Sequence, residues 1–202
     1  MADAGRVISG SAKGVRLAAP GRGTRALTDR VKQTLFGILD PDLDGAVVLD
    51  LFAGSGAGGI EALSRGAARA VFVEHDPGAC RVIATNLDRA GLRDQGEVVR
   101  ADALGWLGRS AESEASEDVF DIVLVDPPYE AAELLERALA LVGARVRPGG
   151  RVVAKHFWRR SPPAEVGLLA SDRERRFGET ALTFYRRRSS ARGETTEEAT
   201  ER

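Results

Sequence analysis

The chain has 202 residues, of which 43% are hydrophobic and 29% charged, with a net charge of −1, and this composition suits one domain with a buried core. The single cysteine excludes a disulfide-stapled secreted scaffold. No apolar run approaches the roughly 20 residues of a membrane span, which excludes a membrane-spanning protein. The N-terminus has no apolar core of a signal peptide, so we expect a cytoplasmic location. Residues 1–37 hold seven basic and two acidic residues, residues 38–144 hold eight and 20, and residues 145–188 hold 12 and four, so two basic segments flank an acidic middle.

The N-terminal part of the chain is predicted to form a small basic extension. Two β-prone runs, Arg6–Ser9 and Val15–Leu17, flank a turn of Gly, Ser and Lys and indicate a hairpin. Thr28 or Asp29 can cap a helix that continues to about Leu39, after which a proline and a glycine follow.

From residue 46 onward, strand-like and helix-like segments alternate. Strands are expected at residues 47–51, 70–73, 97–100, 120–125, 151–155, 173–177 and 181–185. Helices are expected from the glycine-rich turn at 53–59 through residue 63, over residues 77–90, directly after residue 102, and over residues 131–142. Such βα repeats indicate an α/β fold, in which a mainly parallel, seven-stranded sheet has helices on both faces.

These elements divide the chain into three parts. Residues 1–39 form the basic extension, which we expect to pack on the core, and residues 40–187 form the α/β domain. Residues 188–202 are polar and nearly lack bulky apolar side chains, so we expect this tail to be disordered.

If the two basic segments meet in space, they form a positive face suited to a phosphate backbone. The alternative is that their arginines lie on ordinary surface elements.

A glycine-rich turn follows the first strand of the α/β domain. Gly54, Gly56 and Gly59 have the spacing G-x-G-x-x-G, and Glu74 follows the second of these glycines by 18 residues. The pattern suits a nicotinamide cofactor, but Asp50 would place a negative charge beside a pyrophosphate. S-adenosylmethionine has no phosphate, and its sulfonium and ammonium groups are cationic, so Asp50 favours this cofactor. The alternative is a tight turn that binds no ligand.

Further acids lie where later strands end, and ligands of parallel sheets bind at the carboxyl ends of the strands. Glu74 can accept two hydrogen bonds from ribose hydroxyls. Asp102 can accept one from the amino group of an adenine, or it can cap the helix that follows it. The sequence therefore leaves both roles of Asp102 open.

The fourth strand ends in the turn Asp126-Pro127-Pro128-Tyr129. The two prolines stiffen the turn and remove two donors, so we expect the carbonyl of Pro127 to lack a partner in the ladder. Asp126 and this carbonyl can hold both hydrogens of an exocyclic amine and aim its lone pair at an electrophilic methyl group, while Tyr129 stacks on the base. A chance loop sequence is the alternative.

The two motifs are similar to those of class I methyltransferases that act on amino groups, and the chain from Arg6 to about Arg186 resembles the RsmD family. The resemblance is carried by residues 6–10, 24–32, 49–56, 59–67, 126–129 and 177–180. It implies a Rossmann-like class I fold and transfer of a methyl group from S-adenosylmethionine to a guanine N2 amine of small-subunit (16S) ribosomal RNA. It also implies that the basic extension helps to hold the RNA, within an assembling small ribosomal subunit.

The residues and the resemblance together assign three groups of site residues. The catalytic turn consists of Asp126, Pro127, Pro128 and Tyr129. The predicted cofactor-binding residues are Asp50, Phe52, Ala53, Gly54, Ser55, Gly56, Glu74, His75, Asp102 and Ala103. The predicted RNA-binding residues are Arg6, Lys13, Arg16, Arg25, Arg30 and Lys32. We expect no metal ion, because His75, His156 and Cys80 are too few for a zinc site. We also expect a monomer.

Two segments depart from the family's pattern. Residues 25–28 read Arg-Ala-Leu-Thr where Arg-Pro-Thr is usual, and Lys155-His156 ends the fifth strand where an acid is common. The shape of the RNA-facing loop and the surroundings of the target base therefore stay open. Three other functions remain as alternatives: amino methylation of DNA adenine or cytosine or of a protein glutamine, a non-catalytic ribosome-assembly factor, and a nicotinamide oxidoreductase.

Overall fold

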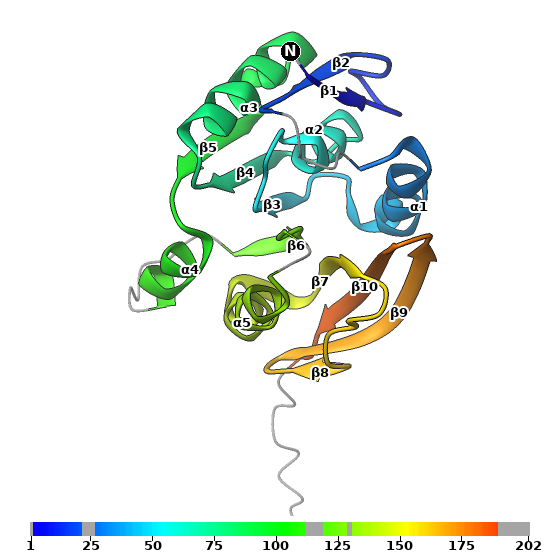
Figure 1. Cartoon of the computed structure of the whole chain (residues 1–202), viewed down its shortest axis with the longest axis vertical. Helices are drawn as coiled ribbons and strands as arrows, with labels where there is room; N and C mark the ends of the chain where they lie inside the picture. The colour runs from blue at the N-terminus through cyan, green and yellow to red at the C-terminus, as the bar shows by residue number, and fades with distance from the viewer. Residues whose placement is uncertain (1, 22–26, 112–118, 129–130, 190–202) are drawn as a thin grey trace, which may run out of the picture.

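Eight strands form one sheet in the part of the chain that the computed structural model describes, which comprises residues 2–21, 27–111, 119–128 and 131–189 (Figure 1). The strand order is β5-β4-β3-β6-β7-β10-β9-β8. The strands from β5 to β7 are parallel, whereas β10 runs antiparallel to both β7 and β9. Two N-terminal strands form a separate antiparallel hairpin.

The helices and strands have the following bounds. The strands are β1 (Ala2–Arg6), β2 (Arg16–Ala19), β3 (Val47–Leu51), β4 (Arg69–Glu74), β5 (Gly96–Arg100), β6 (Phe120–Val125), β7 (Val146–Phe157), β8 (Glu165–Val166), β9 (Leu169–Phe177) and β10 (Thr180–Arg187). The α-helices are α1 (Asp29–Leu39), α2 (Ala57–Ser64), α3 (Pro77–Ala90), α4 (Ala103–Ala111) and α5 (Ala132–Val142). Short 3₁₀ turns follow at Asp40–Asp42, Arg93–Gln95 and Gly143–Arg145.

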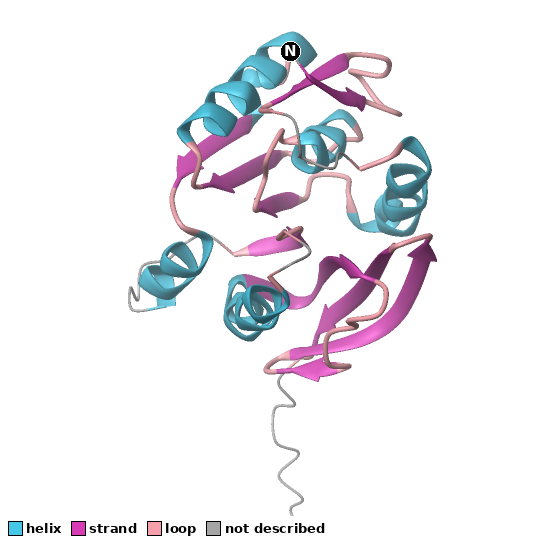
Figure 2. Cartoon of the chain, in the orientation of Figure 1, coloured by secondary structure: helices cyan, strands magenta, loops and turns pink. Residues whose placement is uncertain are grey.

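Helices cover both faces of the sheet, as the βα repeats predict (Figure 2). One apolar cluster joins Phe36, Ile60 and Ile83, from α1, α2 and α3, to one face of the sheet. A second cluster joins Leu107 and Leu139, from α4 and α5, to the other face. The central strands are buried on both sides, which explains their nearly continuous apolar sequences.

The expected α/β fold is confirmed, although the strands differ in part from those predicted, and β7 and β9 begin earlier, at Val146 and Leu169. The sheet gains a short eighth strand, β8, beside the seven that the sequence predicts. The prediction of a strand over residues 6–9 is wrong, because β1 ends at Arg6. The amides of Ile8 and Ser9 instead donate to the carboxylate of Glu61, at 2.8 and 3.1 Å, so they are not free to continue the hairpin ladder.

The N-terminal extension is attached to the α/β domain by buried polar contacts. Glu61 of α2 holds the segment after β1, and Asn86 of α3 holds β2. The Asn86 amide accepts a hydrogen bond from the amide of Ala18, at 2.8 Å, and donates to the carbonyls of Ala18 and Ser55, both at 2.9 Å. One side chain thereby links the extension to the glycine-rich turn.

The C-terminal end of the sheet is paired up to Arg187, and the amide of Arg188 donates to the carbonyl of Leu168 at 2.9 Å. The predicted disordered tail therefore lies almost wholly outside the described residues. No helix within the described ranges is long and apolar enough to cross a membrane.

Candidate active site

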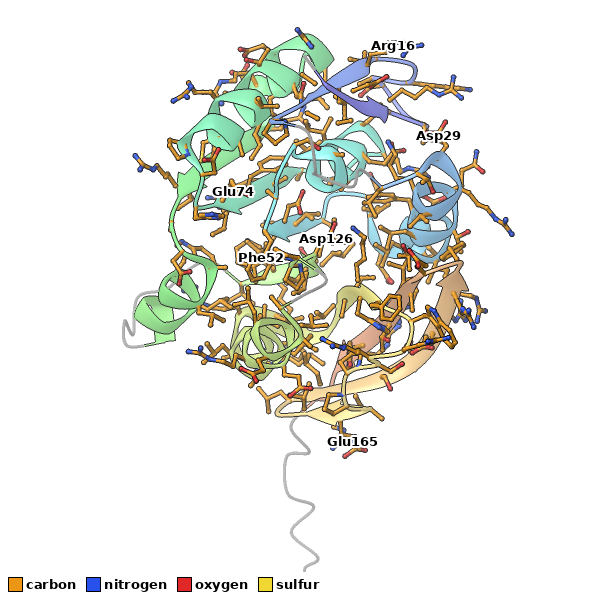
Figure 3. All side chains as sticks on the ribbon, in the orientation of Figure 1. Arg16, Asp29, Phe52, Glu74, Asp126 and Glu165 are labelled. Atoms are coloured by element: carbon orange, nitrogen blue, oxygen red, sulfur yellow. The ribbon has the colours of Figure 1, made fainter. Side chains whose placement is uncertain are left out.

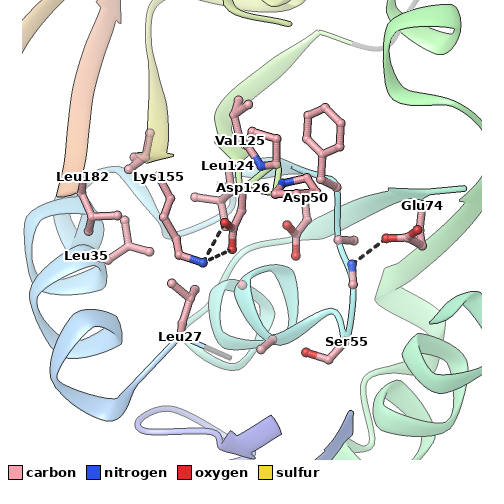
Figure 4. A pocket seen from close by; sticks show the side chains of 18 of the residues that line it. Leu27, Leu35, Asp50, Ser55, Glu74, Leu124, Val125, Asp126, Lys155 and Leu182 are labelled. Atoms are coloured by element: carbon pink, nitrogen blue, oxygen red, sulfur yellow. Dashed lines mark hydrogen bonds and ion pairs between the residues drawn. The ribbon is translucent and has the colours of Figure 1, made fainter. Parts of the chain in front are cut away.

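A cavity of about 380 Å³ opens at the carboxyl ends of β3, β4, β6 and β7 (Figure 4). Its lining comes from the glycine-rich turn, the ends of these strands, Leu27 before α1, Leu35 within α1, and Leu182 of β10. Figure 3 shows Phe52, Glu74 and Asp126 in the middle of the molecule, with Arg16 and Asp29 at its edge. The strand-end rule thus places Asp50, Glu74, Asp126 and the glycine-rich turn around one space, as the sequence predicts.

The turn after β3 has an unusual backbone. Phe52 has a φ of 65°, a left-handed conformation that is rare for a side chain of this size, and its amide is held by the carbonyl of Val73 at 3.1 Å. Gly56, with a φ of 76°, begins α2. A Cβ added at Gly58 would lie 2.8 Å from Leu124 and 3.2 Å from the carboxylate of Asp50, so only glycine fits there.

Glu74 connects this turn to β4. Its carboxylate accepts hydrogen bonds from the amides of Gly54 and Asp76, both at 2.9 Å, and lies 2.9 Å from Nδ1 of His75. These contacts fix the carboxylate at the wall of the cavity. Each carboxylate oxygen has two acceptor positions, so capacity remains for the hydroxyls of a bound ribose.

Asp50 is the most deeply buried acid of the cavity, with 4% of its surface exposed. Its Oδ2 accepts a hydrogen bond from the amide of Gly59 at 2.8 Å. Burial, together with the smaller effect of the nearby charges of Asp126 and Glu74, raises the pKa of Asp50 to about 7, against the effect of this hydrogen bond. A cationic ligand group beside Asp50 would stabilise its ionised form.

The turn after β6 faces the same cavity. Asp126, Pro127 and Pro128 all line it, and the carbonyl of Pro127 accepts no hydrogen bond from the described part of the chain. Lys155 of β7 lies 2.8 Å from each carboxylate oxygen of Asp126. Tyr129, the fourth predicted catalytic residue, lies outside the described residues. Two acceptors, the Asp126 carboxylate and the Pro127 carbonyl, are therefore present for an amine.

The predicted cofactor residues are brought together in large part. The following line the cavity: Asp50, Phe52, Ala53, Gly54, Ser55, Glu74 and His75. Gly56, Asp102 and Ala103 lie outside this lining. Asp102 is exposed and accepts a hydrogen bond from the amide of Gly105 at 2.8 Å, so its role as a helix cap is observed, whereas its contact with an adenine stays a prediction.

The predicted RNA-binding residues differ in exposure. Arg6 and Arg16 are exposed and form surface ion pairs with Asp29 and Asp3, and Lys13 and Arg30 are also exposed. Arg25 lies outside the described residues.

The prediction that Lys32 contacts RNA is wrong for this structure. Lys32 is 0% exposed, its ammonium donates to the carbonyl of Arg6, and burial lowers its pKa. Its spacing from Leu35 and Phe36 places it on the buried face of α1, which helical periodicity indicates.

Sequence reasoning also missed several residues. Lys155 binds Asp126, and only the parallel pairing of β6 with β7 brings them together. Leu27, Leu35 and Leu182 complete the apolar wall of the cavity. Arg173 and Arg175 are exposed, and their pairing with Phe184 and Leu182 places them on the sheet face that α1 covers.

Comparisons with known proteins agree with this architecture. The putative rRNA methyltransferase YlbH of Bacillus subtilis is 39% identical over 186 residues, which cover 91% of this chain and 99% of the relative. The Ribosomal RNA small subunit methyltransferase D of Escherichia coli is 39% identical over 140 residues, or 68% of this chain and 66% of the relative.

Solved structures show the same fold. A putative methyltransferase of Escherichia coli, yhhF, superposes with a TM-score of 0.78 at 31% identity, covering 91% of this chain and 97% of that one. A hypothetical protein of Thermus thermophilus superposes with a TM-score of 0.75 at 33% identity, covering 89% and 97%. These neighbours confirm the Rossmann-like class I fold.

A family model described as Conserved hypothetical protein 95 matches residues 5–186. The matched span contains the glycine-rich turn, Glu74 and the Asp126-Pro127-Pro128 turn, which together line the cavity. The chain therefore belongs to this family, which is the RsmD family that its motifs resemble.

Proposed function

We propose that this protein transfers a methyl group from S-adenosylmethionine to the exocyclic N2 amine of a guanine in small-subunit (16S) ribosomal RNA. Membership of the family supports the proposal, as do relatives named as ribosomal RNA methyltransferases. The observation that carries it is a single cavity that joins the glycine-rich turn to the Asp126-Pro127 turn. The substrate is the RNA of an assembling subunit in the cytoplasm, and the enzyme acts as a monomer.

The residues present fit S-adenosylmethionine. Glu74 is fixed at the wall of the cavity, where it can accept hydrogen bonds from the ribose hydroxyls. Asp50 offers a buried carboxyl to the cationic methionine end. Gly58 also lines the cavity, and it lacks a side chain that would crowd the Asp50 carboxylate. When bound, the cofactor supplies an electrophilic methyl group on a positively charged sulfur.

The chain's own contribution is to hold the amine and exclude water. The Asp126 carboxylate and the Pro127 carbonyl each accept one hydrogen of the exocyclic amine, which reduces the conjugation of its lone pair with the base. The stiff proline turn fixes both acceptors, so the lone pair is aimed rather than activated by a strong base. The base must leave its stack to reach this position.

The basic side chains define where the RNA backbone lies. Lys13 and Arg30 are exposed on the extension, and Arg173 and Arg175 are exposed on the sheet face that α1 covers. Figure 1 shows β2, α1 and β9 along one side of the molecule. The N-terminal and C-terminal basic segments thus share a side, which is suited to phosphate groups.

The test is tritiated methyl transfer to unmodified 30S particles, naked 16S RNA and DNA, followed by nucleoside analysis. We expect N2-methylguanosine in the RNA and no label in DNA. Asp126→Ala should reduce the rate by about 100-fold or more, whereas Asp94→Ala, the same change at an exposed residue before β5, should leave it unchanged.

Binding measurements separate the other functions. Calorimetry should show tight binding of S-adenosylhomocysteine and none of NAD. Tight NAD binding alone would indicate an oxidoreductase. RNA binding without methyl transfer would overturn the proposed function in favour of an assembly factor. Full activity of Asp126→Ala would overturn the assignment of the catalytic turn.

A further inference from the structure

Lys155 and Asp126 form an ion pair in the wall of the cavity, in which the lysine is buried and the Asp126 side chain is 30% exposed. The Lys155 ammonium lies 2.8 Å from both oxygens of the carboxylate, and the lysine is 8% exposed (Figure 4). The pairing of β6 with β7 places Val125 opposite Ala154. The next residue of each strand, Asp126 and Lys155, therefore projects on the same face of the sheet.

The surroundings of Asp126 disfavour a negative charge. Burial raises the pKa of Asp126, and Lys155 opposes this effect through its charge and its hydrogen bond. Figure 4 shows Asp126 between Lys155 on one side and Asp50 on the other. The cavity walls from α1 and β10 are apolar. Among the described residues, the other titratable groups that line the cavity are Lys155, Asp50, Glu74 and His75, and Lys155 is the one in contact with the Asp126 carboxylate.

We propose that Lys155 is a positioning residue that holds the Asp126 carboxylate in its charged form and aims it at the target amine. The inference rests on the proposed function for the identity of that amine. A carboxylate has about four acceptor positions, so Asp126 can accept a hydrogen from the amine while Lys155 stays bound. If the N–C bond forms while the S–C bond breaks, the S–C electron pair stays on the sulfur of the departing S-adenosylhomocysteine. Positive charge then develops on the nitrogen until its extra proton passes to the Asp126 carboxylate and on to water. A carboxylate stabilises that charge, whereas a neutral acid does not.

The first test compares Lys155→Met, which removes the charge, with Lys155→Arg, which keeps it. The acid limb of the pH profile of kcat/KM should move upward by about 1–2 units in Lys155→Met. At a pH below both midpoints the variant should therefore lose about 10- to 100-fold, and it should recover at high pH. Lys155→Arg should keep the limb near its original position. An equal loss by Lys155→Met at every pH overturns the proposal.

The second test does not depend on methyl transfer. The Asp126 carboxyl is titrated by ¹³C NMR in protein labelled at aspartate, with Asp126→Asn to assign its signal. This measurement is needed because the Asp50 carboxyl also titrates near neutral pH. The Asp126 midpoint should rise in Lys155→Met and not in Lys155→Arg. An unchanged midpoint in Lys155→Met overturns the proposal, even if the rate falls.

The two tests also separate this inference from the proposed function. If the wild-type protein methylates no RNA but the Asp126 midpoint still shifts, the proposed function fails while the effect of Lys155 on Asp126 stands. If the wild type is active and neither the profile nor the midpoint moves, only the role of Lys155 fails. The unfolding midpoint of each variant is measured first, and Lys155→Gln replaces Lys155→Met if the latter does not fold.

Discussion

Asp50 is a buried carboxyl group whose ionisation is expected to control cofactor binding. Its pKa is raised from 3.8 to about 7, chiefly by burial, so the group is mostly neutral at pH 6 and mostly ionised at pH 8. If the ionised form binds the cationic methionine end, the Kd of S-adenosylhomocysteine should be about tenfold weaker at pH 6 than at pH 8. Calorimetry across this range measures the effect.

The control for this prediction is Asp50→Asn, which keeps an acceptor for the amide of Gly59 but cannot ionise. Its affinity should be weak and nearly independent of pH between 6 and 8. A wild-type Kd that stays constant over this range would show that Asp50 does not face the cationic end of the ligand.

The same carboxyl group should lower stability at high pH. The folded pKa of Asp50 lies above the unfolded value of 3.8, so the folded state keeps a proton that the unfolded state releases. The stability from this proton is complete below about pH 4 and is lost as the pH rises to about 7. Asp50→Asn should therefore raise the free energy of unfolding by about 2–4 kcal/mol at pH 8 and change it little at pH 4. Urea denaturation at both pH values measures the free energy of unfolding. A lower value for Asp50→Asn than for the wild type at pH 8 would contradict this prediction.

Single residues also show where sequence reasoning reaches and where it stops. Strand ends of a parallel sheet meet at one edge, and this rule correctly predicts that Asp50, Glu74 and Asp126 surround one cavity. The same rule also predicts Asp102 there, and Asp102 lies outside the lining. The charge of Lys32 suggests a phosphate contact, but the helical period of α1 places this residue on the buried face. Lys155 could not be paired with Asp126 from spacing alone, since 29 residues and a helix separate them.

At the scale of elements, Asn86 links β2 and α3 to the glycine-rich turn. Asn86→Ala would leave the amide and carbonyl of Ala18 and the carbonyl of Ser55 without this partner in a buried place. We expect the free energy of unfolding to fall by about 3 kcal/mol. The affinity for S-adenosylhomocysteine should fall as well, because Ser55 lines the cavity.

Urea denaturation and calorimetry test this link, with Thr85→Ala as the matched control. Thr85 is exposed on the same helix, and its hydroxyl donates only to the carbonyl of Arg81 in that helix. Its loss should change stability by less than about 0.5 kcal/mol. If Asn86→Ala is destabilised but binds the ligand normally, the extension and the cofactor turn are not coupled through this residue.

Elements with strong patterns were predicted closely, and elements set by long-range contacts were not. The capping pair Asp76 and Pro77 and the left-handed Gly91 fix both ends of α3, and the prediction of residues 77–90 is confirmed. The first hairpin strand was displaced because Glu61, more than 50 residues away in the sequence, takes the amides of Ile8 and Ser9. The short β8 forms by pairing with β9, and a run of two residues is too short for the sequence pattern to predict a strand.

At the scale of the whole molecule, the C-terminal basic segment lies beside the cavity. Arg175 pairs with Leu182, and Leu182 pairs with Lys155, so the three side chains form a row across β9, β10 and β7. Strands lie about 4.8 Å apart, which places the row of Arg175 roughly 10 Å from that of Lys155. A phosphate bound by the C-terminal segment would therefore lie within a nucleotide or two of the target base.

This arrangement predicts that both segments contribute to the salt dependence of RNA binding. Each lost phosphate contact should reduce the slope of log K against log [salt] by about 0.7–0.9. Arg30→Glu and Arg175→Glu should each reduce the slope, and the double variant should reduce it by about twice as much. Arg137→Glu, an exposed position on α5 on the other face of the sheet, should bind RNA as the wild type does. Filter binding to 16S RNA at several salt concentrations measures the slopes. If Arg175→Glu keeps the wild-type slope while Arg30→Glu reduces the slope, the RNA contacts the extension alone. A phosphate bound beside Lys155 would contact Arg175, so the loss of Arg175 would then have reduced the slope.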